Sequence, residues 1–184
     1  MSTHPTLGER LGITKPLSQV LLKAERLGLS PRELQTLAVQ RGCIHYSAGD
    51  EPEIALASEA DFSNEELAVG LLSPCLPYDP HSIRLGAAML SAPGNDPARL
   101  ARMARIEHCE VPMRYIAECG FRFEPENEFW PALLSLLPPS VSPPGVLPHP
   151  TRFVAMTGFT RNGPELVTEW QRPGRARQVV HDKR

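Results

Sequence analysis

Helix starts recur at a constant spacing in this chain, and the recurrence limits the possible folds more than any other feature. Leucines stand 33 residues apart at four places, Leu34, Leu67, Leu100 and Leu133. Four positions before the first three of them stand residues that can cap a helix, Ser30, Ser63 and Asp96. Their side-chain oxygens accept hydrogen bonds from the N–H groups that a helix start leaves without partners. Since a repeat of this length holds a pair of helices, the spacing predicts stacked helical pairs.

A second helical pattern lies between these helices, over residues 80–90 and 111–119. Asp79 is the expected cap of the first, and Gly120 stands where the second should end, because glycine favours the left-handed conformation there. A weaker counterpart covers residues 50–60, and a further helix covers about residues 15–27. We therefore expect an all-α fold, a short α-solenoid of two-helix repeats with a period of about 33 residues, HEAT-like in the loose sense. An irregular helical bundle is the alternative.

The chain changes character after residue 137. Six of the thirteen residues from 138 to 150 are proline, which predicts a stiff Pro-rich linker. Residues 151–171 hold two β-rich runs around Asn162-Gly163, and this dipeptide between such runs predicts a C-terminal β-hairpin. The hairpin must dock on these helices or on another chain, because a lone hairpin is marginally stable. The expected organisation is a helical repeat domain over 1–137, the linker, the hairpin and a basic disordered tail over 172–184.

The charge balance does not favour a nucleic-acid or membrane partner for the chain as a whole. Its 19 basic and 21 acidic residues give a net charge of −2, although residues 137–184 alone carry seven basic and three acidic side chains. No apolar run approaches the roughly 18 residues that cross a bilayer, and the first residues lack the features of a secretory signal. These features predict a cytoplasmic protein with no membrane partner, whose four cysteines are thiols.

Metal-ligating and nucleophilic residue types are present, but their spacing matches no catalytic or metal motif. Only Cys43 and His45 lie close enough to form half of a zinc site, so we expect the cysteines to be small apolar core groups. No glycine-rich phosphate loop or nucleophile motif occurs. Glu107 and His108 carry acid–base groups, but a solvated helix face explains them better. We expect no enzyme, no metal and no cofactor; an enzyme would need His108, Cys109 and a carboxylate to converge in one cleft.

Two arginines at matching positions favour the binding of a protein partner. Arg84 and Arg114 occupy corresponding places in the second helices of successive repeats, so stacking would align them. Guanidinium groups placed in this way grip carboxylates or phosphates. A local ion pair, such as Arg114 with Glu118 at i, i+4 spacing, is the alternative. Aromatic residues complete the predicted partner surface, namely Tyr78, Tyr115, Phe121, Trp130, Phe159 and Trp170, unless they are buried in the core.

The function predicted from these features is a non-enzymatic protein–protein interaction module, or a subunit of a larger complex, that binds a partner segment along the groove of the helical repeat. The alternative is a nucleic-acid-binding accessory protein that holds phosphates with an arginine row and the basic tail. The arginines of this alternative are Arg99, Arg102, Arg105, Arg172, Arg175 and Arg177. The salt dependence of binding distinguishes the two hypotheses, because contacts to phosphates weaken steeply as the salt concentration rises. The sequence leaves the oligomeric state open.

Overall fold

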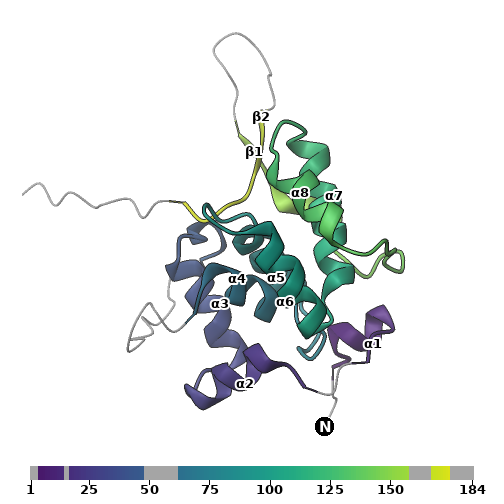
Figure 1. The fold of residues 1–184 in the computed structure, drawn as a ribbon. Coiled ribbons are helices and arrows are strands. Elements are labelled where there is room, and N and C mark those ends of the chain that lie inside the picture. The colour runs from purple at the N-terminus through teal and green to yellow at the C-terminus, as the bar shows by residue number, and fades with distance from the viewer. Residues whose placement is uncertain (1–3, 15–16, 48–61, 158–166, 175–184) are drawn as a thin grey trace, which may run out of the picture.

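Figure 1 shows the computed structural model of the chain, which describes residues 4–14, 17–47, 62–157 and 167–174. The described part is mostly helical, with eight α-helices and one two-stranded antiparallel sheet near the C-terminus. The helices are α1 (Leu7–Leu11), α2 (Gln19–Arg26), α3 (Pro31–Gln40), α4 (Asn64–Leu71), α5 (Pro80–Leu90), α6 (Pro97–Glu107), α7 (Glu110–Phe123) and α8 (Phe129–Leu136). Short 3-10 helices cover Ile44–Tyr46 (η1) and Pro150–Phe153 (η3), and the strands are β1 (Val154–Thr157) and β2 (Val167–Trp170).

Side-chain caps start the helices where the sequence predicts them. Ser30 and Ser63 form capping boxes, in which the hydroxyl accepts the N–H of the third helical residue and the glutamate there accepts the serine N–H. Asp79 and Asp96 cap the starts of α5 and α6, where their side chains accept backbone N–H groups of the first turn. Proline stands in the first turn of α3, α5 and α6, where a missing N–H costs nothing. The fourth start is shifted, because Phe129 is the first residue of α8 and Glu128 precedes it.

Two features of the helices differ from the sequence prediction. Helix α1 was not expected, although Thr6 and Glu9 form a capping box at its start. The prediction for Gly120 is wrong, because α7 continues through it to Phe123. A Cβ atom at position 120 would lie 2.3 Å from the ring of Trp130. Gly120 is therefore needed for the close approach of α8 to α7 and not for a turn.

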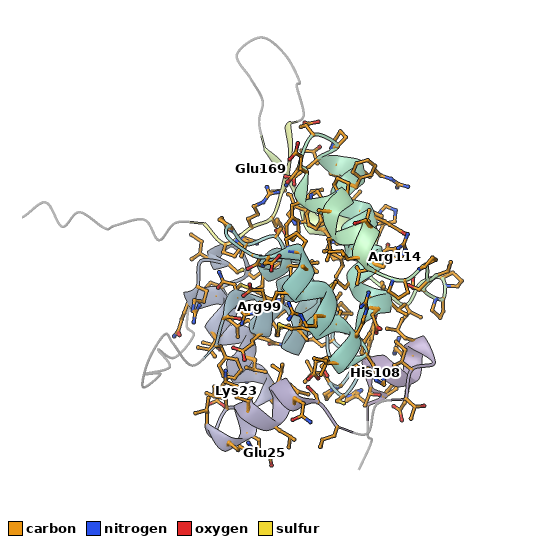
Figure 2. The ribbon with its side chains drawn as sticks, in the orientation of Figure 1. Lys23, Glu25, Arg99, His108, Arg114 and Glu169 are labelled. Atoms are coloured by element: carbon orange, nitrogen blue, oxygen red, sulfur yellow. The ribbon has the colours of Figure 1, made fainter. Side chains whose placement is uncertain are left out.

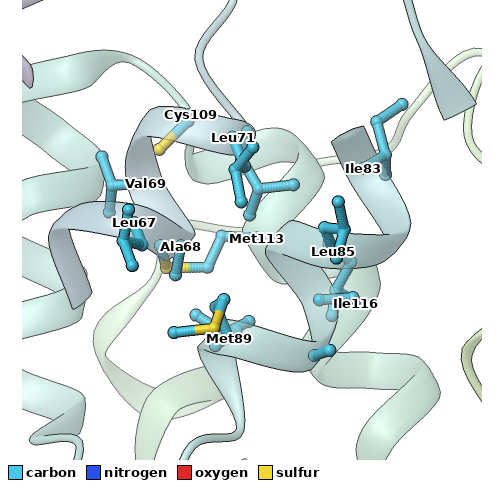
Figure 3. Packing of buried hydrophobic residues seen from close by; sticks show 14 of the residues in the cluster. Leu67, Ala68, Val69, Leu71, Ile83, Leu85, Met89, Cys109, Met113 and Ile116 are labelled. Atoms are coloured by element: carbon cyan, nitrogen blue, oxygen red, sulfur yellow. The ribbon is translucent and has the colours of Figure 1, made fainter. Parts of the chain in front are cut away.

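The core is built around α4. This helix contacts α2, α3, α5 and α6, and Figure 3 shows its Leu67 and Leu71 packed with Met89 of α5 and with Met113 and Ile116 of α7. The four leucines of the repeat are each 1 % exposed or less, which confirms their place in the core. Three of the four cysteines, Cys43, Cys109 and Cys119, are also buried, as expected for small apolar groups.

The two strands of the predicted hairpin pair antiparallel, with Val154 opposite Trp170. Trp170 packs against Trp130 of α8, with ring centroids 5.0 Å apart, and stacks on Phe153 of η3 at 5.7 Å. Figure 1 shows the strands beside α7 and α8, at the end of the molecule opposite to α2. The base of the hairpin is therefore docked on the helices of its own chain. The predicted turn at Asn162-Gly163, the pattern over residues 50–60 and the end of the tail lie outside the described residues.

The Pro-rich segment over residues 138–150 packs against the helices. The hydroxyl of Tyr78 donates to the carbonyl of Val146 at 2.7 Å, and the hydroxyl of Tyr115 donates to that of Pro148 at 2.9 Å. Leu147 is buried between these contacts. The segment thereby forms one wall of a pocket with α5 and α7.

Candidate functional site

The pocket beneath the Pro-rich segment has a volume of about 550 Å³. Helix α5 contributes Arg84, helix α7 contributes Tyr115, and the returning segment contributes His149 and Arg152. The other lining residues are Tyr78, Pro80, Gly145, Leu147 and Pro148. No carboxylate belongs to the described residues that line this pocket. The chain thus brings together two guanidinium groups and an imidazole in a cavity without a negative charge, which suits an anionic ligand.

Arg84 is the inner cation of the pocket. Its guanidinium carbon lies 4.8 Å from the ring centroid of Tyr46, a cation–π contact that fixes its position. Its Nε atom is buried and has no hydrogen-bond partner among the described residues. Burial and the charge of Arg84 together lower the pKa of the neighbouring His45. The positive charge of Arg84 therefore stands at the wall of the pocket.

His149 and Arg152 line the outer side of the pocket. Nδ1 of His149 lies 2.9 Å from the hydroxyl oxygen of Thr151 and 3.4 Å from its backbone nitrogen, and it caps η3, so this cap does not use the other ring nitrogen. Arg152 is exposed, and its guanidinium has no ion-pair partner among the residues that the structure describes. Asp79 is the acidic residue next to the lining residue Pro80. Its carboxylate is occupied by the start of α5 and by Gln35.

Tyr78 and Tyr115 line the wall of the pocket, and their hydroxyls already make hydrogen bonds. Both donate to carbonyls of the Pro-rich segment, as described above, and the guanidinium of Arg10 lies 3.8 Å from the ring centroid of Tyr78. Burial raises the pKa of Tyr115 to about 12, and the nearby Cys119 adds to this effect. Tyr115 therefore stays neutral and keeps its hydrogen bond over the whole physiological pH range.

Arg114 does not join Arg84 in the pocket. Its Nε donates to Glu118 at 2.9 Å, the local ion pair expected as the alternative, and its Nη1 faces the end of α8. There it donates to three carbonyls, those of Leu134, Leu137 and Pro138. Figure 2 shows Arg114 on the α7 and α8 side of the molecule. Its position at the C-terminal end of α8 stabilises that helix.

The remaining aromatic residues of the predicted partner surface differ in their exposure to solvent. Trp130 and Trp170 are fully or almost fully buried and pack on each other, so they belong to the core and present no anchor to a partner in this conformation. A large apolar ring is more stable away from water than on the surface, which explains their burial. Phe121 is 43 % exposed on α7. Phe159 lies outside the described residues.

Most of the described arginines of the nucleic-acid alternative are engaged within the chain. Arg99 lies 3.8 Å from Glu65, Arg105 donates to the carbonyl of Leu136 at 2.8 Å, and Arg172 pairs with Glu124. Arg102 is exposed on α6. Arg175 and Arg177 lie outside the described residues.

The residues considered for acid–base chemistry differ in their exposure to solvent. Glu107 is buried, so the interpretation of Glu107 as part of a solvated helix face is wrong. His108 is exposed and ends α6 in the left-handed region with φ 56°, and Cys109 is buried. Among the described residues no group of three or more His, Cys, Asp or Glu side chains is placed to hold a metal ion.

Sequence reasoning found Arg84, Tyr78 and Tyr115 but missed His149 and Arg152. The latter two come to the pocket only because the Pro-rich segment folds back over α5 and α7. A signal was present in the run His149-Pro150-Thr151-Arg152, where a histidine and an arginine flank a proline turn. It could not be connected to Arg84 without knowing the path of the chain.

Comparison with known proteins does not narrow the function. No family model, no curated protein and no solved structure matches the chain. Within the described residues, none of the helices is both long and apolar enough to traverse a bilayer.

Proposed function

We propose that this protein is a non-enzymatic interaction module that binds an acidic segment of a partner protein. The observation that carries the proposal is the pocket of Arg84, His149 and Arg152, in which no carboxylate among the described lining residues compensates the charges of the two arginines. A glutamate or aspartate side chain can accept two hydrogen bonds from one guanidinium group, which gives both affinity and orientation. The described lining residues include no serine, cysteine, lysine or carboxylate that could work with His149 as a nucleophile or a second acid–base group, which favours binding over catalysis.

A solenoid arrangement of the helices is part of this proposal. Helices α4 and α6 begin at successive repeat positions, α8 begins one residue before the next, and α6 contacts both α4 and α8. Contacts between equivalent helices of neighbouring repeats are the contacts that a solenoid requires. The second helices, α5 and α7, both line the pocket. The partner segment would lie across these two helices, in the groove of a subunit of a larger cytoplasmic complex.

Fluorescence anisotropy with labelled peptides tests the proposal. The probes are a short peptide that carries glutamates among apolar residues and the same peptide with glutamines, measured at about 0.15 M salt. We expect the glutamate peptide to bind about tenfold more tightly or better, since a hydrogen-bonded charge pair is worth about 1.5–3 kcal/mol. Arg84→Met and Arg152→Gln should each remove most of this preference. Arg102→Gln, the same loss of charge at an exposed position on α6, should leave it unchanged.

Two results would contradict the proposal. Equal affinity for the two peptides would show that the pocket does not select an anion. Retention of the preference in both Arg84→Met and Arg152→Gln would place binding elsewhere. A labelled DNA duplex is included as a third probe, and salt-sensitive binding that Arg102→Gln weakens would favour the nucleic-acid alternative.

A further inference from the structure

A second pocket lies between α2, α4 and α6 and shares no lining residue with the first. Its volume is about 280 Å³, and its walls are largely apolar, with Val20 on one side and Met103 and Ile106 on the other. Ile106 is 53 % exposed at its rim. Glu107 also lines this pocket, so an apolar cavity ends on an acidic group. Such a cavity suits a ligand with an apolar stem and one positive charge.

Glu107 has one oxygen that nothing in the described part of the chain satisfies. The residue is only 2 % exposed. Its Oε1 accepts the N–H of Gln19 at 2.9 Å and so satisfies a donor at the start of α2. Its Oε2 is buried and has no hydrogen-bond partner among the described residues. A buried acceptor without a partner is costly, so capping of α2 explains one oxygen and leaves the other unexplained.

Lys23 lines the same pocket but does not balance the negative charge of Glu107. Its Nζ lies 2.8 and 3.0 Å from the two carboxylate oxygens of Glu66. It also lies 4.7 Å from the ring centroid of Phe62. Lys23 and Glu66 therefore neutralise each other, and Glu107 leaves the pocket with one negative charge in excess. One added cation would balance it.

We propose that this second pocket binds the side chain of a lysine from a partner protein, with its ammonium group at Oε2 of Glu107 and its methylene groups against Val20, Met103 and Ile106. Lysine fits better than arginine for a geometric reason. A guanidinium group binds a carboxylate best through both oxygens, whereas an ammonium group is compact and can use one. Since Oε1 already holds the N–H of Gln19, a single oxygen is available. This inference does not depend on the pocket of Arg84.

Chemical-shift titration of the ¹⁵N-labelled full chain tests the inference. The backbone amide of Gln19 is the reporter, because it donates a hydrogen bond to the carboxylate of Glu107. The probe is Nα-acetyl-lysine methylamide. The matched control is the same compound acetylated on Nε, which keeps the stem and loses the charge. We expect a saturable shift of the Gln19 amide with the lysine compound and none with its acetylated form. The arginine analogue should bind about tenfold more weakly or worse.

Variants separate the proposed contact from a general effect of charge. Glu107→Gln keeps an oxygen for the Gln19 N–H and removes the negative charge, so lysine binding should weaken about tenfold or more. Glu25→Gln makes the same change at an exposed position on α2 outside the pocket (Figure 2) and should bind like the wild type. Equal shifts with the two lysine compounds, no saturable shift with either, or unchanged binding in Glu107→Gln would overturn the inference. The comparison of the two compounds uses the wild-type chain and stays decisive if Glu107→Gln fails to fold.

Discussion

The contact between Gly120 and Trp130 shows how one residue fixes the distance between two helices. Trp130 is fully buried against α7, and its indole N–H donates to Glu124 at 2.9 Å. A Cβ atom at position 120 would lie 2.3 to 2.6 Å from three atoms of the indole ring, closer than any side chain tolerates. Trp130 cannot retreat easily, because Trp170 packs on it.

Gly120→Ala should therefore destabilise the protein by about 1–3 kcal/mol, the usual cost of overpacking a core, even though alanine favours a helix by about 1 kcal/mol over glycine. Urea unfolding followed by circular dichroism measures the change. The same substitution in a Trp130→Leu background provides the control, because the smaller side chain removes the clash. If Gly120→Ala costs as much in that background, the close approach is not its cause.

At the level of single elements, the caps decide where helices begin. Ser63 accepts the N–H of Glu66 at 3.1 Å, and the carboxylate of Glu66 accepts the Ser63 N–H at 2.9 Å. Glu66 also holds Lys23 of α2, so the start of α4 is tied to a neighbouring helix as well. Because α4 contacts four other helices, its start affects more of the core than an isolated cap would.

Ser63→Ala should lower the free energy of unfolding by about 1 kcal/mol, the typical value of an N-cap. Ser63→Asn should restore most of it, because an asparagine side chain caps equally well. Ser135→Ala makes the same change inside α8, where the hydroxyl donates only to a carbonyl of its own helix, and should cost little. Thermal denaturation of the three variants compares them. A loss in Ser63→Asn equal to that in Ser63→Ala would argue against a capping effect.

At the level of the whole molecule, Glu124 connects the end of the chain to the helices. Burial raises the pKa of its carboxyl group, but hydrogen bonds from Arg172, Trp130 and Asn127 outweigh this and hold the pKa below its usual value of 4.5. Arg172 stands two residues after Trp170, the last residue of β2. The ionised carboxylate thus stabilises the docking of β2 on α7 and α8.

A lowered pKa in the folded state means that this stabilisation is complete above the unfolded pKa and is lost as the pH falls through the folded one. We expect Glu124→Gln to lower the melting temperature above about pH 5 and to have little effect below about pH 3. Tryptophan fluorescence during heating reports the docking, since Trp130 and Trp170 are buried there. Glu169→Gln, an exposed change on β2, is the matched control. A difference between Glu124→Gln and wild type that is independent of pH would contradict this explanation.

The sequence by itself determined the features that depend on neighbours along the chain. A capping serine or aspartate needs only the next three residues, so the starts of α3 to α6 could be read directly. Burial of the four repeat leucines followed from helical spacing, and the strands of the hairpin from their β-rich composition. The ion pair of Arg114 with Glu118 is local in the same way, and it was foreseen as an alternative.

Only the tertiary structure decided which distant residues meet. Arg84 and Arg152 share a pocket because Tyr78 and Tyr115 bind the carbonyls of a returning Pro-rich segment, and such backbone contacts leave no trace in residue type. The sequence indicates a surface position for Glu107, yet this residue is buried and accepts the N–H of Gln19 at the start of α2. The physical reason is common to these cases: local hydrogen bonds fix elements through short-range sequence, whereas burial and pockets depend on where those elements pack.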